Sequence, residues 1–213
     1  GMLDSIFVYD PSFTTDGGLL LCWPGKEPRR AEVELARQAA EALDIPIIGE
    51  VEAPGTVEGG DMFWIDQNTL AVGEGYRTNA AGIDQVQIFM RPLGVDVVRV
   101  PLPYWQGPDE CLHLMSLISP VDEKLAVVYK PLMSVPFVQL LEGLGWRFVE
   151  VPDEEFATQG TNVLKVAPGK VLMLKDNPVT IQRLRDAGVE VHTYKGDEIS
   201  HNRAGGPTCL TRP

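Results

Sequence analysis

Apolar and polar positions follow one pattern that occurs four times along the chain, at a spacing of roughly fifty residues. Each copy contains a polar residue, an apolar strand, a turn, a helical stretch and a second apolar strand. The first apolar strands are residues 19–22, 70–73, 125–128 and 171–174. The polar positions that align are Asp10, Asp61, His113, Asn162 and Cys209. A period of this size predicts a propeller or array, in which equivalent positions of the copies point toward one another.

The helical and second-strand segments indicate an α/β protein. Helical periodicity is clearest over residues 32–43, 80–90, 135–144 and 179–187. The last two helices are followed by Gly145 and Gly188, as is common at helix C-termini. The apolar strands that follow are residues 45–51, 95–102, 146–151 and 189–194. Strands that alternate with helices of this length are typical of α/β folds.

The fifth polar position, Cys209, begins a further unit, of which the chain holds only a predicted first strand at residues 209–211. No linker or low-complexity segment divides the sequence. We therefore predict one closed domain over residues 1–213. The connecting segments all precede the polar positions, so they are placed to surround a shared site.

Composition narrows the classes of partner. The chain has 213 residues, 44% apolar residues and a formal charge of −12, which argues against nucleic acid or an anionic membrane as a partner. No apolar run is long enough to span a bilayer. The three cysteines are scattered and odd in number, which predicts a reducing compartment, and we take the cytoplasm as the default. No dinucleotide or phosphate-binding motif occurs, so we expect no cofactor.

Cys209 and His113 are the first candidates for chemistry. A thiolate attacks electron-poor carbon when its pKa is lowered, and a histidine is a general acid and base near neutral pH. A buried apolar cysteine and a hydrogen-bonded core histidine are the ordinary alternatives. Their equivalent repeat positions favour a shared function. Cys111 and His113 alone are too few ligands for a metal site, and we expect none.

Four charged residues are further candidates for the site. Glu58 and Asp61 flank two glycines, which permit tight turns and the close approach of a ligand, although an acidic turn is the simpler interpretation. Asp10 ends an apolar strand, where a carboxylate often caps a turn. A guanidinium such as that of Arg77 is suited to bind a substrate carboxylate with two hydrogen bonds, although most arginines are solvated.

Five segments of the chain resemble, in order and spacing, the guanidino-group-modifying superfamily. They are FVYD at 7–10, GTVEGGD at 55–61, GEGYRTNAAG at 73–82, LHL at 112–114 and GGPTC at 205–209. This superfamily includes dimethylarginine dimethylaminohydrolases, arginine deiminases and amidinotransferases. The resemblance implies a five-bladed α/β propeller of strand-strand-helix-strand units, here with an incomplete fifth blade.

The resemblance also implies roles for residues. Cys209 would attack the guanidinium carbon, and His113 would protonate the leaving amine and then activate water. Glu58 and Asp10 would hold the planar cation. Arg77 matches the residue that grips the carboxylate of the amino acid, and Asp4 matches a further acidic substrate contact.

Position 115 distinguishes branches of the superfamily. Deiminases and amidinotransferases carry Asp two residues after the histidine, and this chain has Met115. The expected activity is therefore hydrolysis of an N-omega-methylated arginine to citrulline and an amine, through a covalent thiouronium intermediate. A deiminase-like hydrolase of another guanidino compound is the first alternative. The second is a weak or inactive guanidino-binding homologue.

The alternative of a weak or inactive homologue follows from the length of the chain compared with that of its relatives. Relatives carry about fifty to sixty residues before the segment that matches residues 7–10. Those residues would supply the rest of the fifth blade and a lid. An open notch would expose strand edges, so we predict a homodimer as the simplest cover.

Overall fold

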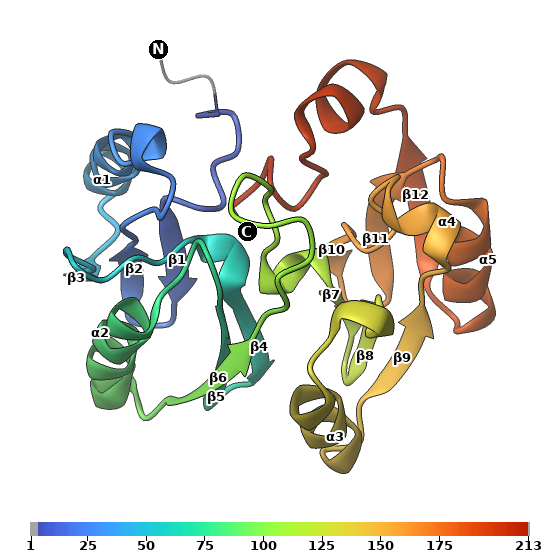
Figure 1. Cartoon of the computed structure of the whole chain (residues 1–213), viewed down its shortest axis with the longest axis horizontal. Coiled ribbons are helices and arrows are strands. Elements are labelled where there is room, and N and C mark those ends of the chain that lie inside the picture. The colour runs from blue at the N-terminus through green and yellow to red at the C-terminus, as the bar shows by residue number, and fades with distance from the viewer. Residues whose placement is uncertain (1–3, 213) are drawn as a thin grey trace. The chain divides into compact units, whose positions relative to one another are not determined.

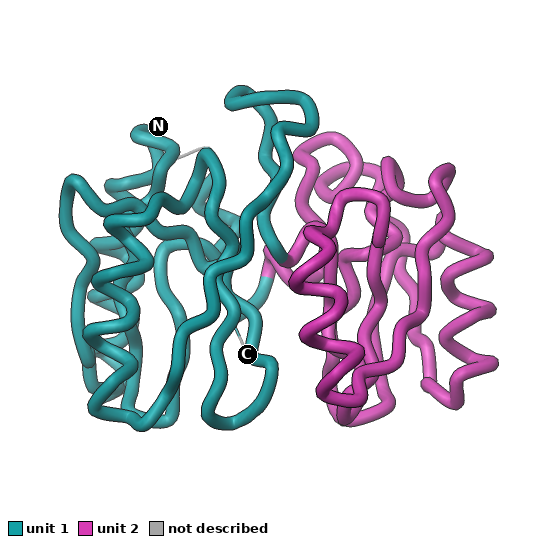
Figure 2. The backbone as a smooth tube through the Cα atoms, turned by 60° about the horizontal axis from the view of Figure 1, so that its bottom comes forward, with its two compact units in different colours: residues 1–114, 211–213 teal, residues 115–210 magenta. Residues whose placement is uncertain are grey.

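The computed structural model describes residues 4–212. The chain forms two compact units, residues 1–114 with 211–213 and residues 115–210 (Figure 2). The single domain expected from the sequence stays a prediction. Each unit contains two copies of the repeat, and each copy is a three-stranded sheet with one main helix (Figure 1).

The first unit contains the repeats that begin near Asp10 and Asp61. Its elements are β1 (Ser12–Thr15), β2 (Gly18–Leu21), α1 (Glu32–Ala42), β3 (Ile47–Glu50), β4 (Met62–Asp66), β5 (Thr69–Glu74), α2 (Ala80–Met90) and β6 (Asp96–Pro101). In each repeat the first two strands pair antiparallel and the third joins the second in parallel. The crossover to a parallel strand runs through the helix, as a parallel pair requires.

The second unit has the same connectivity. Its elements are β7 (Ile118–Asp122), β8 (Leu125–Val128), α3 (Val135–Gly143), β9 (Arg147–Glu150), α4 (Asp153–Phe156), β10 (Leu164–Ala167), β11 (Lys170–Leu174), α5 (Pro178–Asp186) and β12 (Glu190–Tyr194). The strand-strand-helix-strand repeat is thus confirmed in all four copies. The short helix α4 is an addition to the expected pattern.

The alternation of side chains along the middle strands explains the core. In β2, Leu19 and Leu21 pack against α1, whereas Leu20 lies in the core shared with the second repeat. Both faces of the strand are therefore buried, which accounts for its unbroken apolar run. A separate core, with Val127 and Met173 fully buried, fills the second unit.

Helix ends follow local chemistry. The side chain of Asn79 caps α2 by accepting a hydrogen bond from the Gly82 N–H at 2.8 Å. Gly145 and Gly188 lie just after α3 and α5 with φ of 83° and 89°, so the predicted stops are confirmed. Within residues 4–212, no helix has the length and apolar character needed to cross a bilayer.

The strand predicted at residues 209–211 is wrong, because this segment forms a turn followed by irregular backbone. A strand is stable only when its backbone pairs with a neighbour. In the described part of the chain, none of the four sheets includes this segment. Cys209 therefore lies in a turn.

Candidate functional site

A buried histidine-carboxylate pair is the centre of the first unit. His113 Nε2 donates to Glu58 Oε2 at 2.7 Å, and both side chains are buried. Burial opposes charge on the ring, but Cys111, Asp10 and Asp61 raise the pKa of His113 well above 6.5. Burial likewise opposes the charge on Glu58, but the contact with His113 lowers its pKa to about 2. Both shifts favour an imidazolium paired with a carboxylate.

Three further groups fix the position of Glu58. The backbone N–H of Lys26 donates to Oε1 at 3.1 Å, and Arg77 Nη1 lies 3.6 Å from the same oxygen. The backbone N–H of Glu58 donates to Thr78 Oγ1 at 3.1 Å. The carboxylate is thus held by a cation and a backbone donor as well as by the imidazole. Arg77, which we predicted to grip a substrate carboxylate, lies beside the predicted catalytic acid.

The two glycines after Glu58 allow other groups to approach the backbone. A Cβ atom at Gly60 would lie 2.5 Å from His113 Nδ1, and one at Gly59 would lie 2.1 Å from the carbonyl oxygen of Tyr9. Real Cβ atoms cannot come so close. We expected the glycines to admit a ligand, and what they admit here is the imidazole and the turn of residues 8–11. Asp10 lies in this turn, so the prediction that it ends a strand is wrong.

Asp10 lies close to the imidazole but has partners of its own. Its Oδ1 is 3.9 Å from His113 Nδ1 and accepts a hydrogen bond from the Gly60 N–H at 3.0 Å. Its Oδ2 pairs with the buried guanidinium of Arg29, which also pairs with Glu32 at 2.8 Å. Sequence reasoning missed Arg29. The one local signal was its spacing of three residues from Glu32, which suits a helix-surface ion pair.

Asp4 lies at the edge of this network. Its Oδ2 is 2.7 Å from Lys26 Nζ, and its carbonyl oxygen accepts from the Phe7 N–H at 2.9 Å. Because the backbone of Lys26 also contacts Glu58, Asp4 is connected to the buried pair through one residue. A direct role for Asp4 with substrate stays a prediction.

Asp61 links the backbones of the two paired residues. Its Oδ1 accepts from the Leu114 N–H at 2.9 Å, and its Oδ2 accepts from Thr78 Oγ1 at 2.6 Å. Leu114 follows His113, and Thr78 holds the N–H of Glu58. Burial raises the pKa of Asp61 from 3.8 to about 6, although His113, Thr78 and Leu114 act in the opposite direction.

We expect Asp61→Asn to change how stability depends on pH. Because the folded-state pKa of Asp61 is raised, the contribution of this group to stability is complete below pH 3.8 and is lost as the pH rises to about 6. The loss is roughly 3 kcal/mol. Urea unfolding between pH 4 and 6 should show this decline in the wild type relative to Asp61→Asn. The exposed residue Asp96 gives the control, Asp96→Asn, which should keep the decline. Equal profiles for the wild type and Asp61→Asn would contradict the interpretation.

Cys209 belongs to the second unit. Asn162 Nδ2 donates to its Sγ at 3.3 Å. Asn162 Oδ1 accepts from both the N–H and the Oγ1 of Thr208, at 3.1 and 2.7 Å. Sequence reasoning aligned Asn162 as a repeat position but did not include it among the site residues. That Cys209 and His113 meet in one site stays a prediction.

Three of the five aligned polar positions share one structural feature. A side-chain oxygen accepts from the backbone beside the next aligned position: Asp10 from Gly60, Asp61 from Leu114, and Asn162 from Thr208. These bonds connect residues 46 to 53 positions apart. A carboxylate or amide at these places therefore connects consecutive repeats, and their recurrence has a structural cause in addition to any chemistry.

Among residues 4–212, two groups of side chains lie close enough together to hold a metal ion. They are Asp10 with Glu58 and His113, and the more exposed Asp176 with Asp197 and His201. The first group is occupied by the ion pairs described above, so we interpret it as a charge network. We assign no cofactor site.

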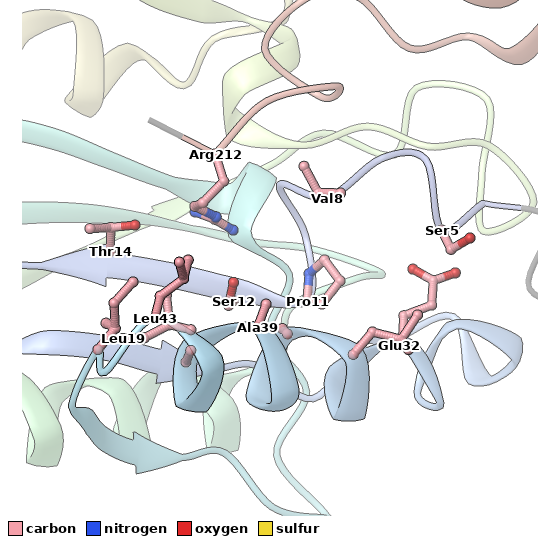
Figure 3. Close-up of a pocket in the computed structure, with 14 residues that line it drawn as sticks. Ser5, Val8, Pro11, Ser12, Thr14, Leu19, Glu32, Ala39, Leu43 and Arg212 are labelled. Atoms are coloured by element: carbon pink, nitrogen blue, oxygen red, sulfur yellow. The ribbon is translucent and has the colours of Figure 1, made fainter.

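A separate cavity of about 530 Å³ lies between α1 and β1 in the first unit (Figure 3). Its walls are mainly apolar, with Glu32 and Arg212 among the lining residues. None of the predicted site residues lines it. The volume of this cavity therefore gives no support to the predicted site, which stays a prediction.

Comparison with known families agrees with the motifs. The sequence profile described as "Arginine deiminase" matches residues 2–142 and 135–213. The chain belongs to the arginine deiminase family. Within this family, the dimethylarginine dimethylaminohydrolase of Streptomyces coelicolor is 35% identical over 98% of this chain and 73% of that protein.

Two solved structures of the family are similar over nearly the whole chain. A dimethylarginine dimethylaminohydrolase from Pseudomonas aeruginosa, complexed with citrulline, has a TM-score of 0.80 and 26% identity, covering 97% of this chain and 75% of that one. Another, an adduct with S-methyl-L-thiocitrulline, has a TM-score of 0.80 and 27% identity, covering the same shares. These comparisons confirm the resemblance and the fold class that the sequence predicted.

The other two cysteines differ from Cys209 in their surroundings. Cys22 is fully buried, and burial raises the pKa of its thiol. Cys111 is exposed, and its Sγ lies 3.5 Å from His113 Nδ1. Cys22 is therefore a core residue, whereas Cys111 is a second accessible thiol that any labelling experiment on this family member must distinguish from Cys209.

Proposed function

We propose that this protein hydrolyses a C–N bond of an N-omega-methylated arginine, giving citrulline and an amine. The observation that carries the proposal is the buried Glu58–His113 pair in a chain of this family. A dimethylarginine dimethylaminohydrolase is 35% identical to this chain. Solved structures of dimethylarginine dimethylaminohydrolases contain citrulline or an adduct with S-methyl-L-thiocitrulline. A pair of one cation and one carboxylate suits a reaction that must donate and then accept a proton.

In the proposed mechanism, Cys209 attacks as a thiolate. Its Sγ forms a bond to the guanidinium carbon, and the C–N bond to the substituted nitrogen breaks as that nitrogen takes a proton from His113. The product is a covalent thiouronium and a free amine. Neutral His113 then takes a proton from water, and the resulting hydroxide attacks the same carbon. The C–S bond breaks to give the thiolate and protonated citrulline, which releases its proton to solvent or to the departed amine.

The carboxylates have an electrostatic role. Glu58 keeps His113 protonated for the first step and is placed to interact with the cationic group of the substrate. We propose that Asp10 also interacts with the cationic group of the substrate, while one of its carboxylate oxygens pairs with Arg29. Arg77 and Asp4 are proposed to contact the amino-acid end of the substrate. Three free thiols are in keeping with a cytoplasmic location, and the homodimer stays a prediction.

A panel of guanidino compounds tests the proposal. We expect citrulline from N-omega-methylated and dimethylated arginine, with a kcat/KM at least about tenfold above that for arginine, because Met115 replaces an acid beside the histidine. Citrulline would be measured colorimetrically and the amine by chromatography. Faster release of ammonia from arginine would favour a deiminase, which the family description also fits. Binding of arginine analogues without turnover would indicate a guanidino-binding homologue.

A further inference from the structure

We infer that Asn162 is a positioning residue for Cys209, which holds the sulfur and favours its thiolate form. The inference rests on the proposed function in one respect, namely that Cys209 is the nucleophile. It concerns groups of the second unit only. The contact that carries it is the 3.3 Å hydrogen bond from Asn162 Nδ2 to Cys209 Sγ.

The orientation of the Asn162 amide follows from its neighbours. The N–H of Thr208 can only donate, so the group that faces it at 3.1 Å must be the amide oxygen. The hydroxyl of Thr208 donates to the same oxygen at 2.7 Å. With its oxygen held twice, the amide must turn its NH₂ group toward the sulfur. The donor is therefore fixed by two bonds to the residue that precedes Cys209.

Backbone geometry makes room for this arrangement. A Cβ atom at Gly206 would lie 2.3 Å from Asn162 Cγ and 2.4 Å from its Oδ1. Glycine at this place lets the turn before Cys209 pack directly on the amide. Gly206 and Thr208 are both buried, so the amide, the turn and the sulfur form one packed cluster.

The chemical consequence concerns the charge on sulfur. A neutral N–H donor stabilises a thiolate more than a thiol, because hydrogen bonds to charged acceptors are the stronger ones. A nucleophile that must attack and later leave benefits from such a donor in both steps. Tyr194, on β12, is a titratable side chain that interacts with Cys209, and its hydroxyl lies 2.9 Å from Ser200 Oγ. Burial raises the pKa of Tyr194 above its ordinary value.

The test measures the reactivity of the sulfur without substrate. In the full chain, the rate of alkylation of Cys209 by iodoacetamide would be followed from pH 5 to 10, with peptide mapping to separate it from Cys111. We expect Asn162→Ala to move the midpoint of the rate profile upward by about one pH unit, since one donor to a charged atom is lost. Asn162→Asp should move it further, because a carboxylate repels the thiolate.

Two more variants complete the design. Thr208→Val removes one of the two bonds to the amide oxygen and should give a smaller upward shift. Asn202→Ala is the control, since this exposed amide donates to the Glu198 carbonyl oxygen at 3.4 Å, and it should leave the midpoint unchanged. Circular dichroism would confirm that each variant folds. If Asn162→Ala does not fold, the midpoints of Asn162→Asp and Thr208→Val test the inference.

A midpoint that stays within about 0.2 pH units of wild type in the folded Asn162 variants would overturn the inference. The result is independent of turnover. If the substrate panel gives no product and the midpoint still moves, the proposed function fails and the inference holds. If methylated arginine is hydrolysed and the midpoint does not move, the proposed function holds and the inference fails.

Discussion

Cys209→Ser is expected to lower kcat/KM for the methylated arginine substrate by about 10⁴-fold or more, the scale on which loss of a covalent nucleophile acts. A serine hydroxyl ionises far less readily than a thiol and is a much poorer nucleophile than a thiolate. The substrate should still bind, because Glu58, His113 and Arg77 belong to the other unit and are unchanged. Citrulline formation measures the first effect, and calorimetry with an arginine analogue measures the second.

A cationic electrophile gives an independent readout of the same prediction. A haloacetamidine resembles the guanidinium group, so it should label Cys209 ahead of Cys111 and leave buried Cys22 untouched. Cys209→Ser should abolish the fast labelling, and Cys111→Ser should keep it. An arginine analogue should protect the wild type. Equal labelling of Cys111 and Cys209 in the folded protein, or full activity of Cys209→Ser, would contradict the assignment.

The repeat could be predicted because each of its elements has a local cause. Apolar runs, helical spacing and two glycines at helix ends are properties of neighbouring residues, and all four copies formed as expected. Residues 209–211 could not be predicted in this way. Their apolar character is compatible with a strand, but strand formation depends on a partner distant in sequence.

The site could be predicted only in part. Glu58 and His113 were proposed because carboxylates and histidine are the groups that acid-base chemistry uses, and the structure pairs them at 2.7 Å. Arg29 and Thr78 were missed because their contacts with Asp10 and Asp61 span 19 and 17 residues, and the local spacing of Arg29 from Glu32 does not reveal them. Asn162 was recognised by its repeat position, but only coordinates place its amide beside a sulfur.

The first unit also shows why buried charge and function are hard to separate in this sequence. Glu58, Asp10 and Asp61 each accept hydrogen bonds from backbone or cationic partners that the fold supplies. A buried carboxylate without such partners would be costly, so these acids are paired whether or not they act on a substrate. A variant that removes charge but keeps shape is therefore needed to separate the two roles.

Glu58→Gln is that variant, and we expect two effects. Loss of the carboxylate removes the counter-charge that is hydrogen-bonded to His113 and lies beside Arg77, which should cost about 3 kcal/mol in the free energy of unfolding near pH 6. The proton on His113 should also be held less tightly, so kcat should fall by about 10²- to 10⁴-fold. Urea unfolding and citrulline formation measure these effects.

The pH dependence of stability distinguishes loss of the Glu58–His113 ion pair from a general loss of packing. The folded-state pKa of Glu58 is lowered from 4.5 to about 2, so its contribution is complete above pH 4.5 and is lost as the pH falls toward 2. The pKa of His113 is raised, so its contribution is complete below pH 6.5 and is lost as the pH rises through the folded-state value. The difference in stability between wild type and Glu58→Gln should therefore be largest between about pH 4.5 and 6.5. A difference that is constant from pH 3 to 9 would mean that the pair does not act through its charge.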